Sequence, residues 1–172
     1  MCIDTVNSSS KTTRELALGK PRHSLLTIGY EGLELPDFLR FLAYHKINVL
    51  VDVRELAASR KKGFSKASLS QALEERGIEY MHIKALGSPG AIRKQLKTDW
   101  DYNAFFTAYD EYLDKQKDTI MMLGEVVEEK DRVCLMCFES EHERCHRSRV
   151  ADRLSDLFRG HLSIEPVNTW VR

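Results

Sequence analysis

A carboxylate, a thiol, an imidazole and a guanidinium lie close together in the segment 139–147. Glu139 follows an apolar run, and Cys145, His146 and Arg147 stand where an amphipathic helix is predicted to begin. A helix N-terminus favours an anion and lowers the pKa of a thiol, so Cys145 is a candidate nucleophile and His146 a candidate proton carrier. Arg147 could grip a phosphate or carboxylate, and Glu139 could act as a base. The alternative is structural, with Cys145 partly buried and Arg147 in surface ion pairs.

Further polar side chains follow the other predicted strands. Tyr30 follows the first strand, Asp52 and Arg54 end the second, and His82 follows the third. Open α/β folds bind ligands at the edge where parallel strands end, so these side chains are predicted to converge there. If the second and fourth strands are neighbours, Asp52 or Arg54 approaches Glu139. A structural ion pair between sheet and helix is the other interpretation of Asp52 and Arg54.

The elements that must position these residues alternate between strand and helix. Short apolar runs predict strands at 24–28, 47–53, 78–83, 133–138 and 162–167. Helical patterns begin at Pro36, at a cap on Ser65, at a cap on Asp99, near Thr119 and at Cys145. This alternation predicts an α/β fold: a mostly parallel open sheet with helices on both faces, in a single compact domain. The domain is predicted to span 24–172, after a polar, mobile tail at 1–23 that holds a short helix near 14–18.

Composition excludes several classes of protein. The 172 residues carry 26 Lys plus Arg and 26 Asp plus Glu, so no global charge indicates nucleic acid or an anionic membrane as a partner. No apolar run approaches the roughly 18 residues of a membrane span, and the first 20 residues lack the apolar region of a signal peptide. Cys134, Cys137 and Cys145 cluster as in a reduced protein, which predicts a cytoplasmic location.

A basic run at 59–66 offers a second kind of function. Arg60, Lys61, Lys62 and Lys66 could bind a nucleic-acid backbone while Phe64 stacks on a base. A solvated loop is the simpler interpretation of such a run.

Sharper motifs are missing from the sequence. It holds no GxxxxGK[ST], no GxGxxG and no phosphate-cradling cysteine loop. CxxC spacing occurs at 134–137 and HExxH spacing at 142–146, but the first lies on a predicted strand and the second mostly in a predicted loop. No metal ligands are therefore predicted, although a site built from Glu139, Cys145, His146 or His82 remains a third hypothesis. No motif identifies a cofactor.

Four segments carry a resemblance to a known family. They are TIGYEG (27–32), DVRELAASRKKGFSKASL (52–69), GIEYMHIKALG (77–87) and CLMCFESEHERCHRSRVADRL (134–154). With these segments in this order, the chain resembles the domain-of-unknown-function family 488 (DUF488). The resemblance implies a compact cytosolic α/β domain of bacteria or archaea without an established general activity. It favours one shared pocket of Tyr30, Asp52, Arg54, Ser59, His82, Glu139, Cys145, His146 and Arg147.

The chain departs from this family in one loop. Members usually carry proline after the DVR-like motif, whereas this chain reads ELAAS at 55–59, which changes the loop that presents Ser59. The turn at 86–90, LGSPG, also lacks the second glycine and the early arginine expected from the family at their usual places, and Arg93 could substitute for that arginine.

The leading hypothesis is an enzyme-like pocket for a phosphate-bearing ligand, either a nucleotide or a nucleic-acid end. The reaction would be a hydrolysis or a group transfer, with Glu139, Cys145 and His146 as the catalytic residues. The predicted substrate-binding residues are Tyr30, Asp52, Arg54, Ser59, His82 and Arg147. The alternatives are a non-catalytic nucleic-acid-binding module that uses the loop 60–66 and the Glu/Cys/His metal site. Neither the substrate nor the oligomeric state can be predicted from the sequence.

Overall fold

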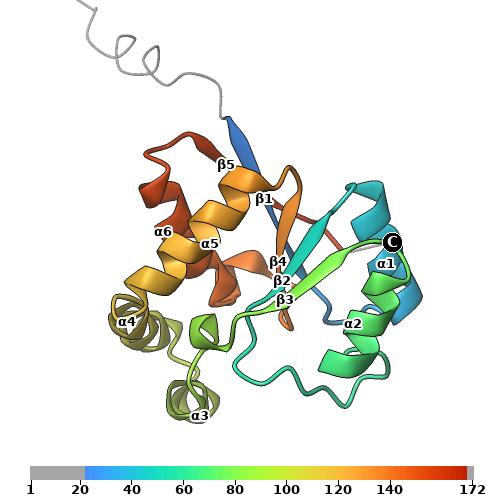
Figure 1. Ribbon diagram of the computed structural model, residues 1–172. Helices are drawn as coiled ribbons and strands as arrows, with labels where there is room; N and C mark the ends of the chain where they lie inside the picture. Colours follow the sequence, from blue (N-terminus) through green and yellow to red (C-terminus); the bar gives the residue numbers. More distant parts are fainter. Residues whose placement is uncertain (1–21, 170–172) are drawn as a thin grey trace, which may run out of the picture.

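A five-stranded parallel sheet forms the centre of the protein (Figure 1). The computed structural model describes residues 22–169. The strand order is β3-β2-β4-β1-β5, and all four pairings are parallel. The strands are β1 (His23–Gly29), β2 (Val49–Asp52), β3 (Glu79–His82), β4 (Val133–Cys137) and β5 (Leu162–Pro166). The predicted α/β fold is confirmed, and β2 and β4 are neighbours.

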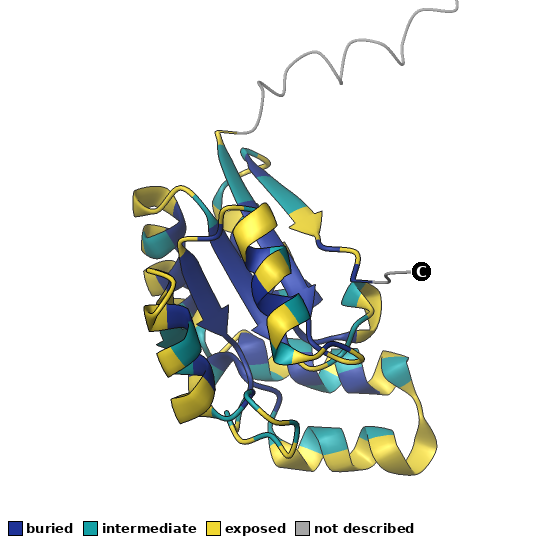
Figure 2. Ribbon diagram, turned by 90° about the vertical axis from the view of Figure 1, so that its right-hand side faces the viewer, coloured by how far each residue is buried: buried dark blue, intermediate teal, exposed yellow. Residues whose placement is uncertain are grey.

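Helices cover both faces of the sheet, as Figure 1 shows. One face packs against α1 (Leu35–Tyr44) and α2 (Lys66–Glu74), and the other against α4 (Tyr102–Leu113), α5 (Lys117–Glu129) and α6 (Arg147–Leu157). The inner strands β1, β2 and β4 are largely buried, the edge strands β3 and β5 are partly exposed, and the outward helix faces are exposed (Figure 2). Among residues 22–169, no helix is both long and apolar enough to cross a membrane.

Two α/β connections carry short additional helices. A 3₁₀ turn η1 (Lys84–Leu86) and α3 (Gly90–Asp99) follow β3, and a second turn η2 (His142–Arg144) lies between β4 and α6. The sequence predicted only a turn at 86–90, because α3 has few apolar residues and buries none of its side chains. Helices that lack a buried face leave little periodic signal in a sequence.

Two predicted helix starts need correction, and a third is confirmed in position but lacks the expected capping bond. Asp99 ends α3, and Asp101 is the residue that caps α4, by accepting a hydrogen bond from the amide of Ala104. Ser65 stands at the N-cap of α2, but its hydroxyl makes no capping hydrogen bond. Cys145 precedes α6, whose N-cap is His146. The predicted tail and its short helix at 14–18 lie outside the described residues, except at the start of β1.

The parallel register brings the ends of β1, β2 and β4 together. Gly29 pairs with Cys137, and Asp52 pairs with Met136. The chain that leaves β4 passes directly over Gly29, where a Cβ would lie 1.8 Å from the carbonyl oxygen of Glu139. A residue with a side chain therefore does not fit at this position, and the sequence after β4 is held against the end of β1.

A buried ion pair fixes the end of β2. The guanidinium of Arg54 donates to both carboxylate oxygens of Asp52, at 2.8 and 2.6 Å, and also to the hydroxyl of Tyr30 and the carbonyl of Phe64. Tyr80 donates to the same carboxylate at 2.6 Å. Asp52 and Arg54 therefore form the structural ion pair that the sequence left as one alternative, and neither side chain makes a hydrogen bond to Glu139.

Replacing Asp52 by Asn should destabilise the protein strongly. The change removes the negative charge that compensates Arg54, which is 5% exposed. Leaving a buried charge unpaired costs about 3 to 5 kcal/mol of the free energy of unfolding, measurable by urea denaturation. The exposed pair of Asp37 and Arg40 supplies the control, since Asp37→Asn should cost less than about 1 kcal/mol. An equal decrease in the free energy of unfolding in the two variants would contradict the larger contribution expected of the buried pair.

Candidate functional site

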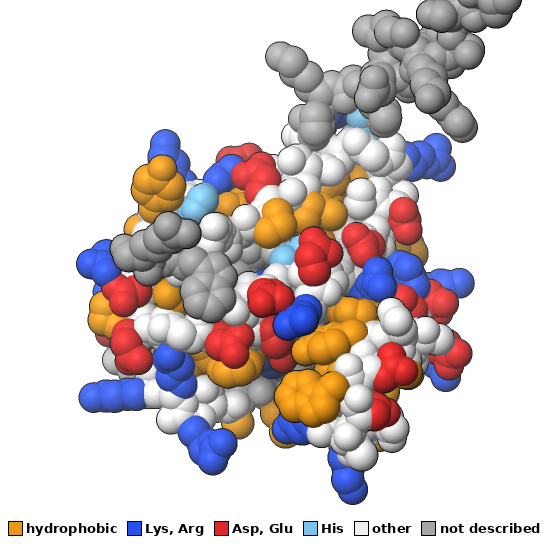
Figure 3. Space-filling model, turned by 180° about the vertical axis from the view of Figure 1, so that it is seen from behind, with side chains coloured by type: hydrophobic (Ala, Val, Ile, Leu, Met, Phe, Trp, Pro, Cys, Tyr) orange, Lys and Arg blue, Asp and Glu red, His pale blue; other side chains and the backbone are white. Residues whose placement is uncertain are grey.

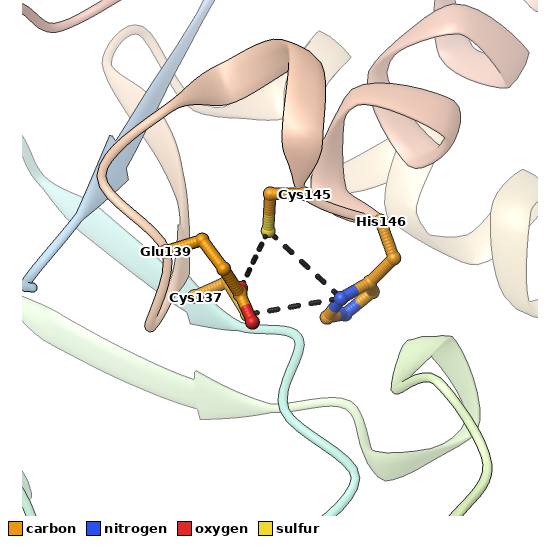
Figure 4. A group of neighbouring side chains, drawn as sticks. All are labelled: Cys137, Glu139, Cys145 and His146. Carbon is orange, nitrogen blue, oxygen red and sulfur yellow. Dashed lines mark hydrogen bonds between the residues drawn. The ribbon is translucent and has the colours of Figure 1, made fainter. Parts of the chain in front are cut away.

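Two thiols, a carboxylate and an imidazole meet at the carboxyl end of β4 (Figure 4). One ligand atom from each of Cys137, Glu139, Cys145 and His146 lies within 4.8 Å of the others. The Sγ atoms of Cys137 and Cys145 lie 3.1 and 3.0 Å from Oε2 of Glu139. They lie 3.7 and 3.9 Å from Nδ1 of His146. The side chains come from the end of a strand, the loop after it and the start of a helix.

The orientation of His146 is set by the backbone of the neighbouring strand. Its Nε2 lies 2.8 Å from the carbonyl oxygen of Val53, directly after β2. A carbonyl only accepts, so Nε2 carries a proton and Nδ1 is the atom directed at the two sulfur atoms. The ring of Tyr109 packs edge-on against the imidazole at 5.3 Å.

The loop between β4 and α6 is held by a buried arginine. Arg147 is 1% exposed, and its guanidinium donates to the carbonyl oxygens of Glu139 and Ser140. No salt bridge joins Arg147 to a carboxylate among the residues described. Its positive charge instead acts on the thiol of Cys145 and helps to lower that pKa.

Burial and mutual contact shift the protonation of the cluster. Burial and the neighbouring sulfur of Cys145 raise the pKa of Glu139 to about 7. Burial opposes the charge of Cys145, but a hydrogen bond from Cys137 and the charge of His146 lower its pKa well below the usual thiol value. Burial and the neighbouring sulfur of Cys145 raise the pKa of Cys137. Burial opposes the charge of His146 as well, but the neighbouring sulfur of Cys145 raises the pKa of the imidazole. Without another cation, these shifts favour negative charge on Cys145 beside positive charge on His146.

A cavity of about 1190 Å³ opens beside the cluster. Cys137, Glu139 and His146 line it, but Cys145 does not. Its other walls come from the segment after β1, the loop after β2, and helices α3 and α4. The imidazole and the carboxylate are thus accessible from the cavity, while the sulfur of Cys145 lies behind them.

The structure separates the predicted substrate-binding residues into two groups. Tyr30, Arg54 and Ser59 line the cavity, and so do the predicted catalytic residues Glu139 and His146. The remaining predicted residues, Asp52, His82, Cys145 and Arg147, do not line it. His82 is directed at the backbone, with Nε2 2.9 Å from the carbonyl oxygen of Arg54.

Neither arginine predicted to hold an anion has a free guanidinium face for it. Arg54 directs four hydrogen bonds from its side chain at Asp52, Tyr30 and Phe64. Arg147 donates to two backbone carbonyls. Both side chains shape the site, and an anion in the cavity would need other partners.

Cys137 is the cluster member that was not among the predicted site residues. It lies within the apolar run 133–138, which predicts a buried strand. Its signal was its spacing from Glu139, because residues two apart in an extended segment point to the same side. A thiol and a carboxylate so placed, followed by Cys145 and His146, form a donor set, whereas the CxxC partner Cys134 packs on the opposite face of the sheet.

The basic loop at 59–66 does not present its aromatic residue to a ligand. Phe64 is fully buried and stacks on Tyr30 with ring centroids 4.3 Å apart. Lys61 lies 3.6 Å from a carboxylate oxygen of Glu34. Figure 3 shows acidic and basic side chains interspersed on the rear face of the molecule, without a continuous basic surface. Phe64 therefore cannot stack on a base as predicted.

Comparison with family models identifies residues 34–154 as "Domain of unknown function DUF488". This match covers most of the chain and includes the whole cluster. The chain belongs to this family. No curated protein and no solved structure gave a significant match. Membership in DUF488 confirms the resemblance seen in the sequence, and the chemistry of the site must be argued from its geometry.

The raised pKa of Glu139 predicts a pH-dependent stability of the protein in the presence of a chelator. The folded state keeps this proton up to a pH of about 7, whereas the unfolded chain releases it near 4.5. Stability should therefore fall as the pH rises between these values. Urea denaturation at several pH values should show a steeper loss for the wild type than for Glu139→Gln. The exposed neighbour Glu141 gives the matched control, and a Glu139→Gln profile parallel to that of Glu141→Gln would contradict the prediction.

Proposed function

We propose that the cluster of Cys137, Glu139, Cys145 and His146 binds a zinc ion at the floor of the cavity and that the protein is a zinc-dependent enzyme. Thiolate, imidazole and carboxylate are the ligands that zinc prefers in proteins. The set Cys₂His occurs in catalytic zinc sites, where a fourth position is kept for water or substrate. The resulting activity would be a hydrolysis or a group transfer.

The spacing of the donor atoms carries this proposal. Zinc bonds of 2.0 to 2.3 Å in a tetrahedron require donor atoms about 3.3 to 3.8 Å apart. Four separations between sulfur, oxygen and nitrogen atoms of the cluster are 3.0, 3.1, 3.7 and 3.9 Å, within about 0.3 Å of this range, and all four donor atoms lie within 4.8 Å of one another. The convergence of four donor side chains of the types that bind zinc on one such small volume supports the proposal.

The surroundings of the cluster fit the same interpretation. A metal-bound histidine usually donates its other N–H to a backbone carbonyl or a carboxylate, as His146 does to Val53 at 2.8 Å. The buried positive charge of Arg147 compensates the excess negative charge of two thiolates and a carboxylate. Such second contacts orient the ligands and favour their deprotonated forms.

The chain's own residues would divide the work of the reaction. A bound zinc ion supplies a Lewis acid and an activated water. Cys137, Cys145 and His146 hold fixed positions, because each is buried. Glu139 follows the strand in a loop and lines the cavity, so its carboxylate can leave the coordination position and accept a proton from water there. Because Glu139 and His146 line the cavity, a substrate would lie in the cavity next to these two side chains.

Thiolate chemistry at Cys145 is the second candidate, favoured by the lowered pKa of this residue. A nucleophile must reach its substrate, however, and Cys145 is 1% exposed and does not line the cavity. Of the two candidates, the geometry therefore favours metal binding, with Cys145 as a ligand.

Elemental analysis of protein purified without an affinity tag tests the metal site. We expect about one zinc ion per chain in the wild type and its loss in Cys137→Ser and Cys145→Ser, since each variant removes a thiolate ligand. Cys134→Ser is the matched control, because Cys134 is equally buried but packs in the core on the other face of the sheet. Its zinc content should equal that of the wild type.

Reconstitution makes the same test independent of expression conditions. Chelated protein incubated with zinc and then desalted should recover the metal, and cobalt should give thiolate-to-metal charge-transfer absorption. Protein that stays metal-free after this treatment would overturn the proposal. Once a substrate is known, unchanged turnover in Cys145→Ser would overturn both proposed roles of Cys145, as a zinc ligand and as a nucleophile.

A further inference from the structure

A buried hydroxyl without a partner lies in the wall of the cavity. Ser88 is 1% exposed and lines the cavity, and its Oγ makes no hydrogen bond within the protein. A buried hydroxyl left unpaired costs about 1 to 3 kcal/mol, so its retention indicates a partner that is not part of the chain. The position of Ser88 on the cavity indicates where that partner binds.

The start of α3 lies next to this hydroxyl and offers further donors. Pro89 occupies the N-cap and has no side chain that can accept a hydrogen bond from the first turn. The amides of Gly90, Ala91 and Ile92 are therefore left without an intrahelical or capping acceptor. Together with the helix dipole, such amides favour an anion.

An arginine from the same helix completes the group. Arg93 lines the cavity, and its Nε is buried without a partner. Its terminal nitrogen donates to a carboxylate oxygen of Glu55. A Cβ on Gly90 would lie 3.7 Å from that oxygen and 3.8 Å from the arginine nitrogen, so the ion pair is adjacent to the first turn of α3. Glu55 holds the guanidinium of Arg93 in place but accepts from only one of its nitrogens, so Nε of Arg93 is left as a donor.

We infer that Ser88, the first-turn amides of α3 and Arg93 form a subsite for an oxyanion, a phosphate or carboxylate group of the ligand. Lys97 and Arg60 also line the cavity, but so do carboxylates such as Glu31 and Glu141, so the positive charge of the subsite itself comes from Arg93. This subsite takes the place of Arg54, whose guanidinium nitrogens all donate within the protein, and of Arg147, which is buried and does not line the cavity. The assignment of this anion to the substrate of a zinc centre rests on the proposed function. The binding of the anion does not depend on the proposed function.

Titration of the full-length protein with inorganic phosphate, and separately with acetate at matched ionic strength, tests the subsite. Phosphate should shift the amide resonances of Gly90 and Ala91 in ¹H–¹⁵N spectra. Ser88→Ala should weaken the binding about tenfold, the effect of one hydrogen bond to a charged group. Binding of phosphate alone would assign a phosphorylated substrate, and binding of acetate as well would extend the class to carboxylates.

Two variants in α3, Arg93→Gln and Lys94→Gln, provide the second measurement and its control. Arg93→Gln should weaken phosphate binding to a similar degree, whereas Lys94→Gln removes the same charge from an exposed position of α3 outside the cavity lining and should bind as the wild type does. The inference is overturned if Gly90 and Ala91 do not respond, or if Ser88→Ala and Arg93→Gln bind phosphate like Lys94→Gln.

The zinc content of Ser88→Ala separates this inference from the proposed function. Ser88 supplies no metal ligand, so the variant should hold as much zinc as the wild type while it binds phosphate less tightly. A protein without zinc that still binds phosphate through Ser88 would refute the metal centre alone. A protein with zinc whose α3 amides ignore phosphate would refute the subsite alone.

Discussion

The geometry of the site depends on the buried guanidinium of Arg147. It donates to two carbonyl oxygens of the loop after β4 and so sets the path that returns the chain from Glu139 to Cys145. Burying a cation is costly unless negative charge lies nearby. No carboxylate pairs with it among the described residues, and its charge helps to lower the pKa of the Cys145 thiol. One side chain thus shapes the loop and makes an anionic cluster favourable within it.

This balance of charge explains why the same cluster suits protons and a metal ion. With protons alone, Cys145 is a thiolate, His146 is protonated, and Cys137 and Glu139 have raised pKa values. A divalent ion would displace the remaining protons, and the two thiolates and the carboxylate would exceed its charge by one unit, which Arg147 compensates. The cluster is close to neutral in both states. Metal binding therefore requires deprotonation of the ligands and little rearrangement of the fold.

The sequence predicted where the site lies better than how its residues act. Apolar strands followed by polar residues predicted the parallel sheet, and Glu139 and His146 do meet at its carboxyl edge. Arg54 was expected to hold a ligand, but it binds Asp52, because a sequence does not show which donors the chain itself uses. Cys137 was missed since an apolar strand hides a ligand at its end. Helix α3 was missed because it buries no side chain.

Tyr109 links the cluster to the proposed anion subsite. Its buried ring packs against His146, and its hydroxyl donates to the carbonyl of Leu86 at 2.6 Å, two residues before Ser88. On the other side, Gly87 lies so close to the backbone at 54–55 that a Cβ would be 2.1 Å from the amide nitrogen of Glu55. That segment directly follows Val53, whose carbonyl accepts from His146. Because both connections run through buried contacts, the separation of His146 and Ser88 is fixed by the fold. The cavity should therefore select ligands by the distance between their anionic group and their reacting atom.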